Sequence, residues 1–434
     1  MPDLLDEAIA VWRECPDRLP DLEQTSPVQT YSRERQTLHE REFDLFLQSV
    51  RSELTSVPGD RAGRIGAQGR ISSAFVRLAS EGLDLNGAHL RLLIDGGFSA
   101  IGTQLGRKAR RLGVPASVAD ILQASRNAWT ACGLQLLLGE AMRLTPSIFA
   151  YSMLYPATDN YLDAADISQE EKMGFSVRFG RRLGGEDVVP ANRHEQEIWR
   201  LVAMIEDEHP RAVCATVYAS LLEIHRAQQE SVRFQMRGSG RVAAGIMRVS
   251  FDKGGASVLA DARLASPTLS PQAERFAYFW GVFLQLADDL QDLQEDLGGG
   301  SLTLFTDAVG HEPLDALTAK TLHFGAEVMR LMDGLPHAHA NGGSEDWSGP
   351  LKDLIRTSCR TVVIRSVGEL DEFYSPEYVS ALEAYSPCRF AFLRERRKQM
   401  SARRAATGRL FEAFLAGDDD EPAFPLLPSS LLPR

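Results

Sequence analysis

Cysteine is scarce in this chain, and its few copies are scattered. The five cysteines among 434 residues are Cys15, Cys132, Cys214, Cys359 and Cys388. No two of them form a CxxC pair, and no histidine or cysteine has the spacing of zinc ligands. These absences argue against a disulfide framework and against a structural zinc site. We therefore expect reduced thiols in a cytoplasmic protein.

The sequence also lacks long apolar runs and an excess of positive charge. No apolar stretch approaches the length of a membrane span, so no integral membrane segment is expected. The acidic opening residues, Met1 to Glu7, do not resemble a secretory signal. With 47 basic and 59 acidic residues, the net charge is −12. This balance argues against a nucleic-acid-binding protein.

Alternating β-branched runs are scarce, and helical patterns dominate. We predict an all-α chain in which glycine and proline clusters separate the helices. The predicted helices span residues 35–54, 73–83, 88–111, 117–143, 145–164, 168–183, 192–207, 211–236, 240–252, 256–263, 271–296, 314–334, 349–371, 376–385 and 389–415. We expect residues 1–34 to form an arm outside the core, residues 35–416 to form one helical domain, and residues 417–434 to form a disordered tail.

Two acidic clusters carry the chemical information in the sequence. Asp159 and Asp163 lie four residues apart, and so do Asp288 and Asp292, with Asp289 between them. On a helix, this spacing stacks each pair on one face. Stacked carboxylates repel one another unless a cation lies between them. Two such faces opposite each other offer hard oxygen ligands, so we predict that these five aspartates bind Mg²⁺.

Each acidic stripe is predicted to continue for a further turn. If the first helix persists, Asp166 and Glu170 lie on the same face as Asp159. Glu295 continues the second stripe below Asp292. Magnesium that is held by few carboxylates usually shares its remaining positions with substrate phosphates.

The residues before each cluster are almost wholly apolar. Residues 148–157 precede Asp159, and residues 276–287 precede Asp288. A helix that is apolar nearly all round is buried, so we expect the carboxylates at the mouth of an apolar pocket. A diphosphate at such a rim, with hydrocarbon in the pocket, is the arrangement needed to ionise an allylic diphosphate. The alternative is a pair of solvated acidic helix faces.

Three basic residues are further candidates. Lys253 precedes the adjacent glycines Gly254 and Gly255, which we expect to interrupt a helix. Lys253 and the nearby Arg248 are predicted to bind substrate, because a lysine at such a break can bind phosphate as a point charge. The alternative is an ordinary turn between helices. Arg178 is a candidate diphosphate ligand, with ion pairing to surface acids such as Glu170 as the alternative.

The motif residues resemble those of a known superfamily. The segment Gly281 to Asp292, GVFLQLADDLQD, is similar to the second aspartate-rich motif of the class I isoprenoid synthases. The segment Leu154 to Asp163, LYPATDNYLD, is similar to the DxxxD form of the first motif. This resemblance covers about residues 60–400. It implies an all-α bundle around a central apolar pocket, with three Mg²⁺ ions holding a diphosphate at its rim.

The resemblance also assigns roles. It implies catalytic roles for Asp159, Asp163, Asp288 and Asp292, and substrate binding by Gln285 of the second motif. The chain departs from the pattern of chain-elongating prenyltransferases, which carry an arginine pair soon after the first motif. Here the first arginine after that motif is Arg178. The asparagine, serine and glutamate metal triad of common terpene cyclases is also missing, and aspartates stand in its place.

We therefore predict a magnesium-dependent class I terpene synthase that ionises a prenyl diphosphate and cyclises or captures the cation. One alternative is a transferase that condenses prenyl diphosphates, either head to head or by chain elongation. Another is a catalytically silent relative that binds a lipid or a partner. A homodimer is compatible with all three.

Overall fold

The structure, a computed structural model, describes residues 2–22, 30–164, 166–236, 243–335, 347–401, 404–418, 420–421 and 423–424. Within these residues the chain is helical and contains no strand, which confirms the predicted all-α class. No helix in the described part of the chain is both long and apolar enough to cross a membrane. The five cysteines, all of which are described, form no disulfide.

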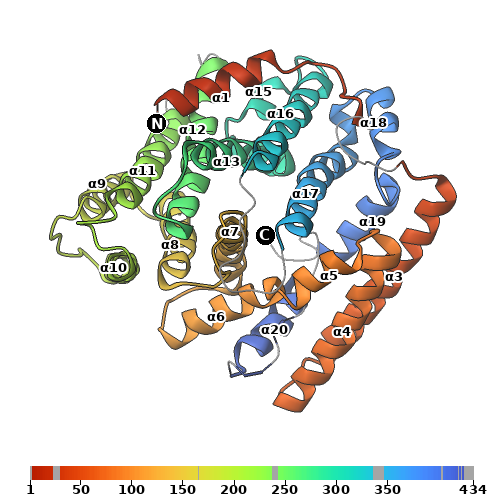
Figure 1. The fold of residues 1–434 in the computed structure, drawn as a ribbon, viewed down its shortest axis with the longest axis horizontal. Helices are drawn as coiled ribbons and strands as arrows, with labels where there is room; N and C mark the ends of the chain where they lie inside the picture. The colour runs from red at the N-terminus through yellow and green to blue at the C-terminus, as the bar shows by residue number, and fades with distance from the viewer. Residues whose placement is uncertain are drawn as a thin grey trace.

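Figure 1 shows how the helices are arranged. In the first half they are α1 (Pro2–Glu14), α3 (Arg33–Thr55), α4 (Arg61–Gly82), α5 (Gly87–Ile94), η1 (Phe98–Ala100), α6 (Ile101–Arg111), α7 (Val118–Leu137), α8 (Pro146–Asp163), α9 (Gln169–Leu183) and α10 (Arg193–Glu208). In the second half they are α11 (Ala215–Met236), α12 (Ala243–Ala265), α13 (Pro271–Gln291), α14 (Leu293–Gly299), α15 (Leu304–Ala308), α16 (Asp315–Asp333), α17 (Ser348–Glu369), η2 (Asp371–Phe373), α18 (Pro376–Glu383), α19 (Phe390–Ser401) and α20 (Arg404–Leu415).

Two groups of buried apolar side chains hold these helices together. One group lies among α3, α4, α6 to α11 and α20. The other lies among α1, α12, α13 and α16 to α18, and it includes the stacked rings of Phe279 and Phe324. Helices α7 and α12 contribute side chains to both groups. They therefore join the two groups, and Figure 1 shows α7 near the middle of the view.

The adjacent glycines of α12 do not interrupt a helix, so the predicted break at this point is wrong. Helix α12 runs without interruption through Gly254 and Gly255. A Cβ on Gly254 would lie 2.6 Å from the carbonyl oxygen of Gly281 in α13, and one on Gly255 would lie 2.5 Å from the ring of Tyr278. The glycines let the two helices approach more closely than any side chain allows. They mark a contact between helices and not a turn.

Several predicted helices end earlier than expected or divide in two. The predicted helix 88–111 divides into α5 and α6 around Gly97, whose φ of 84° lies in the left-handed region. The predicted helix 271–296 divides at Asp292. The predicted helix 389–415 is helical in its described parts, α19 and α20, and residues 402–403 between them lie outside the described part of the chain. Helix α8 ends at Asp163, where Ala164 takes up an extended ψ of 125°. The stripe predicted from Asp159 to Glu170 therefore does not exist as one helical face.

Both ends of the chain pack against the bundle where they are described. The side chain of Trp12 in α1 is 5% exposed and contacts the rings of Phe251 and Phe324. At the other end, Glu421 pairs with Arg64 of α4. Residues 1–34 were predicted to lie outside the core and residues 417–434 to be disordered, but Trp12 and Glu421 pack against the bundle. Residues 23–29 and 425–434 lie outside the described part of the chain.

Candidate functional site

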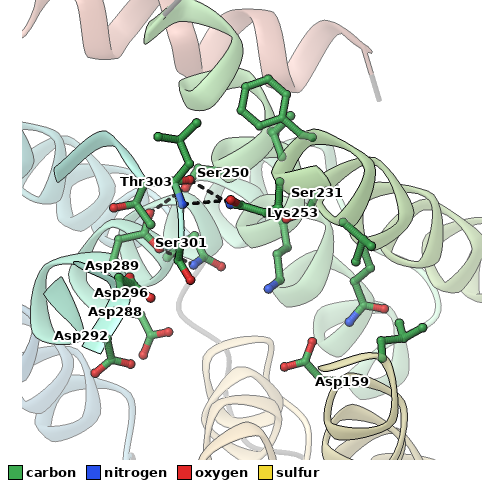
Figure 2. A pocket seen from close by; sticks show the side chains of 18 of the residues that line it. Asp159, Ser231, Ser250, Lys253, Asp288, Asp289, Asp292, Asp296, Ser301 and Thr303 are labelled. Atoms are coloured by element: carbon green, nitrogen blue, oxygen red, sulfur yellow. Dashed lines mark hydrogen bonds between the residues drawn. The ribbon is translucent and has the colours of Figure 1, made fainter. Parts of the chain in front are cut away.

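A cavity of about 480 Å³ lies between α7, α8, α11, α12 and α13. The described residues of its wall include five aspartates and two basic side chains. These charged residues are Asp159, Asp288, Asp289, Asp292, Asp296, Arg126 and Lys253. Figure 2 shows four of the aspartates gathered on one side, Asp159 across the cavity from them, and the Lys253 ammonium group between. The described residues of the two predicted acidic clusters thus share one cavity.

Helix caps fix the position of both clusters. Thr145 caps α8 by accepting a hydrogen bond from the backbone N–H of Ile148, and Pro146 occupies the first turn. Ser270 and Pro271 begin α13 in the same way. Asp159 and Asp288 each lie in the last turns of their helices, where the apolar segment that anchors the helix gives way to the cavity. Asp163 ends α8, but its side chain lies outside the described part of the structure.

The break between α13 and α14 brings in an aspartate that the sequence pattern missed. Asp292 ends α13 with a non-helical backbone, at φ −97° and ψ 5°, and α14 begins at the next residue. The change of direction places Asp296 in the cavity wall, whereas the predicted Glu295 is exposed and is not part of that wall. Burial, and next the charge of Asp288, raise the pKa of Asp296. The sequence pattern assumed one continuous helix through Asp292, so it could not predict that Asp296 lines the cavity.

Asp289 differs from its neighbours because it is buried and bonded. Its side chain is 6% exposed. Ser250 of α12 donates a hydrogen bond of 2.8 Å to its Oδ2, and Gln285 donates one of 2.7 Å to its Oδ1. Burial raises the pKa of Asp289 to about 7, although these two hydrogen bonds oppose the shift. Gln285 lines the cavity as predicted, and in this structure its amide orients Asp289.

Lys253 lies at the centre of the site. It follows Ile246, Val249 and Ser250 along the face of α12 that lines the cavity. Its ammonium group makes no hydrogen bond or ion pair with any described residue. The charge of Asp159 is the largest influence on Lys253 and raises its pKa, more than offsetting the effect of burial, while Asp288 and Asp289 act in the same direction. Lys253 is therefore a protonated cation held among carboxylates.

Arg126 is a second cation in the cavity wall, and sequence reasoning missed it. It lies on α7, one turn after Gln123, which also lines the cavity. Its guanidinium group is exposed and has no acidic partner among the described residues. Most arginines in the described chain pair with a carboxylate, so an unpaired one that faces a cavity is a candidate anion ligand. Nothing near Arg126 in the sequence indicates this position, because it arises from the packing of α7 beside α8.

The two arginines that were predicted to bind substrate lie elsewhere. Arg248 is exposed on α12 and pairs with Asp6 of α1 at 2.6 Å. Arg178 of α9 forms an ion pair with the buried carboxylate of Glu195 in the first turn of α10. Neither arginine lines the cavity. Both make ion pairs between helices, and the structure does not bring them into the cavity wall with the aspartates.

The cavity wall is more polar than the predicted apolar pocket. Apart from its charged residues it carries amides and hydroxyls on several helices, which are Gln123, Gln169, Gln228, Gln235, Gln285, Ser231, Ser250, Ser301 and Thr303. Beyond Tyr155 and Gln228 lies a mostly apolar cavity, but its volume is only about 30 Å³. That space suits about one water molecule, whereas a benzene-sized ring needs about 150 Å³. This small cavity is therefore not the deep apolar pocket that was predicted.

The donor chemistry of the cavity suits a hard cation. Carboxylate oxygens of Asp159, Asp288 and Asp292 face a shared space, and hard oxygen ligands are those that Mg²⁺ prefers. Among the described residues, no three His, Cys, Asp or Glu side chains lie close enough together to hold an ion unaided. Substrate oxygens would therefore have to complete the coordination of an ion here.

Comparisons with known proteins add no assignment. No model of a known protein family matches the chain, and no curated protein matches it. The similarity to the class I isoprenoid synthases thus rests on the motif residues alone.

Proposed function

We propose that this chain is a magnesium-dependent enzyme that ionises a prenyl diphosphate. The observation that carries the proposal is the single cavity in which Asp159 faces Asp288 and Asp292, with Lys253 between them. Among the described residues, the wall carries five acidic side chains and two basic ones, so acidic groups predominate. Such a cavity accepts a diphosphate only together with metal cations. The similarity of both acidic segments to the aspartate-rich motifs supports the same reaction.

Each group has a distinct task in this proposal. Asp159, Asp163, Asp288 and Asp292 hold Mg²⁺, which neutralises charge on the departing diphosphate. Lys253, whose pKa is raised by the charge of Asp159, donates hydrogen bonds to diphosphate oxygens. Ser250 and Gln285 hold Asp289 in place behind the cluster. The prenyl chain lies against the apolar part of the wall, formed by Val232, Phe234, Ile246, Val249 and Leu302.

The test is release of pyrophosphate from allylic diphosphates of five, ten, fifteen and twenty carbons, with and without Mg²⁺. We expect Asp288→Asn to lower kcat/KM by about 10²–10³-fold, the usual effect of removing one electrostatic contributor at a reacting centre. Arg248→Ala is the matched control, because Arg248 lies on α12 outside the cavity. No pyrophosphate release from any of these substrates would exclude the proposal and favour a catalytically silent relative.

Arg126 favours a second candidate function, which is condensation of two prenyl diphosphates. A second diphosphate needs a second cationic site, and Arg126 supplies a cation on α7, apart from Lys253 on α12. Under this candidate, Arg126→Ala raises the KM for isopentenyl diphosphate and leaves that for the allylic substrate nearly unchanged. If the chain turns over an allylic diphosphate alone, and product length does not grow when isopentenyl diphosphate is added, this candidate is excluded.

A further inference from the structure

One part of the cavity wall carries polar side chains that make no hydrogen bond to any described residue. Gln228 and Ser231 lie one turn apart on α11, and both line the cavity. Neither side chain makes a hydrogen bond to any described residue. Their neighbour Gln229 differs, because its amide donates to Ser176 at 2.8 Å. Both residues are partly exposed, so water or a ligand can complete the hydrogen bonds of this amide and this hydroxyl.

Gln228 lies where an incoming hydrocarbon would stop. It is shared by the walls of the polar cavity and of the small apolar cavity behind it, together with Tyr155. Because the apolar cavity has only about 30 Å³, a prenyl chain cannot pass beyond this point. A cation formed beside Lys253 and the carboxylates therefore remains in a space lined by amides and hydroxyls.

We propose that Gln228 and Ser231 bind a water molecule that captures the prenyl cation, so that the product is an alcohol. This inference rests on the proposed function and names its final step. The bond from carbon to diphosphate oxygen breaks, and its electron pair leaves with the diphosphate. The water oxygen forms a new bond to the allylic carbon, and its proton passes to the released diphosphate. The Gln228 carbonyl and the Ser231 hydroxyl accept the hydrogens of the water and direct its lone pair toward the carbon.

The test uses the same four allylic diphosphates in water enriched in ¹⁸O, with products separated by mass spectrometry and pyrophosphate measured in parallel. For the unmodified chain we expect mainly alcohol that carries ¹⁸O. In Gln228→Met with Ser231→Val, we expect the ratio of alcohol to diene to fall about tenfold or more, the effect of a lost hydrogen bond on a rate. Pyrophosphate release should persist in this variant, because the carboxylates and Lys253 are unchanged.

Gln229→Met is the matched control, since it makes the same change one residue along α11 without facing the cavity, and it should leave the product ratio unchanged. If the double variant does not fold, Gln228→Met alone provides the same comparison. Pyrophosphate release with only hydrocarbon products, or an alcohol ratio unchanged in the variants, overturns this inference but leaves the proposed function intact. Absence of pyrophosphate release overturns the proposed function and this inference with it.

Discussion

At the scale of single residues, Lys253 offsets part of the negative charge of the cavity wall. Without it, the described wall would hold five carboxylates and only Arg126 as a cation. Its position among Asp159, Asp288 and Asp289 keeps it charged. A protonated lysine here does part of the work of a metal ion in the free protein and becomes a diphosphate ligand in the complex.

We predict that Lys253→Met lowers kcat/KM for pyrophosphate release by about 10²-fold, because a charge-assisted contact to the leaving group is lost. Lys253→Arg should retain more activity, since it keeps the charge but changes its geometry. Steady-state kinetics on the preferred allylic substrate measure both effects. Equal activity of Lys253→Met and the unmodified chain would remove Lys253 from the reaction.

Asp261 is a buried acid with a structural consequence. It is 1% exposed, accepts a hydrogen bond of 2.7 Å from Asn127, and has no partner for its Oδ1 among the described residues. Burial raises its pKa well above the usual value. The folded state therefore binds this proton more tightly than the unfolded state. The resulting stability is present at low pH and is lost as the pH rises from the unfolded value, near 3.8, through the folded pKa.

We predict that Asp261→Asn raises the melting temperature at pH 8 by about 1–3 °C and has little effect near pH 4. The neutral amide keeps an acceptor for Asn127 but does not ionise in the core. Thermal unfolding followed by circular dichroism across this pH range provides the measurement. A gain that is equal at both pH values would show that ionisation of Asp261 is not its cause.

At the scale of elements, the contact between α12 and α13 positions the site. Gly254 and Gly281 face each other so closely that a Cβ on Gly281 would lie 2.1 Å from the Gly254 carbonyl oxygen. This contact sets the separation between Lys253, next to Gly254, and the acidic end of α13. Ser250 on α12 bonds Asp289 on α13 across the same interface. Packing of backbone against backbone thus fixes the geometry of the charged groups.

We predict that Gly254→Ala destabilises the protein by about 1–3 kcal/mol, because the methyl group must displace backbone atoms of α13. Gly69→Ala is the matched control, since it adds the same methyl group within α4 where no atom lies within 4 Å. The control should be neutral or stabilising by up to about 1 kcal/mol. Urea unfolding of both variants measures the difference, and equal stabilities would contradict the close-contact explanation.

At the scale of the whole molecule, the cavity draws residues from helices that are far apart in the chain. Arg126 on α7 and Asp296 on α14 belong to one wall although 170 positions separate them. A ligand that bridges this wall links the two groups of buried apolar side chains. Ligand binding should therefore stabilise the bundle as a unit.

We predict that Mg²⁺ and inorganic pyrophosphate together raise the melting temperature, by more than the sum of their separate effects. At 100 times the dissociation constant the gain is about 2.7 kcal/mol. EDTA should abolish the gain, and Asp288→Asn should reduce it. Without metal, Asp288→Asn should melt at the same temperature or slightly higher, since repulsion among the carboxylates is relieved. Absence of any shift with both ligands at millimolar concentration would contradict a magnesium diphosphate site.

The sequence by itself determined the helical class and the residues of the acidic clusters. Periodicity reports which face of a helix is buried, and the spacing of Asp288 and Asp292 is a local property. The ends of α8 and α13 were less predictable, because a helix stops where packing and capping favour it. For that reason Asp296 entered the cavity and Glu295 did not.

Only the tertiary structure decided which basic side chains face the carboxylates. It also decided the volume of the apolar cavity beside Tyr155 and Gln228. Arg178 and Arg248 look as suitable as Arg126 in the sequence, but Glu195 and Asp6 neutralise them from other helices. The adjacent glycines at 254 and 255 resemble a helix break until α13 is packed against them. Each of these outcomes depends on residues that are distant in the chain, and local patterns carry no information about such contacts.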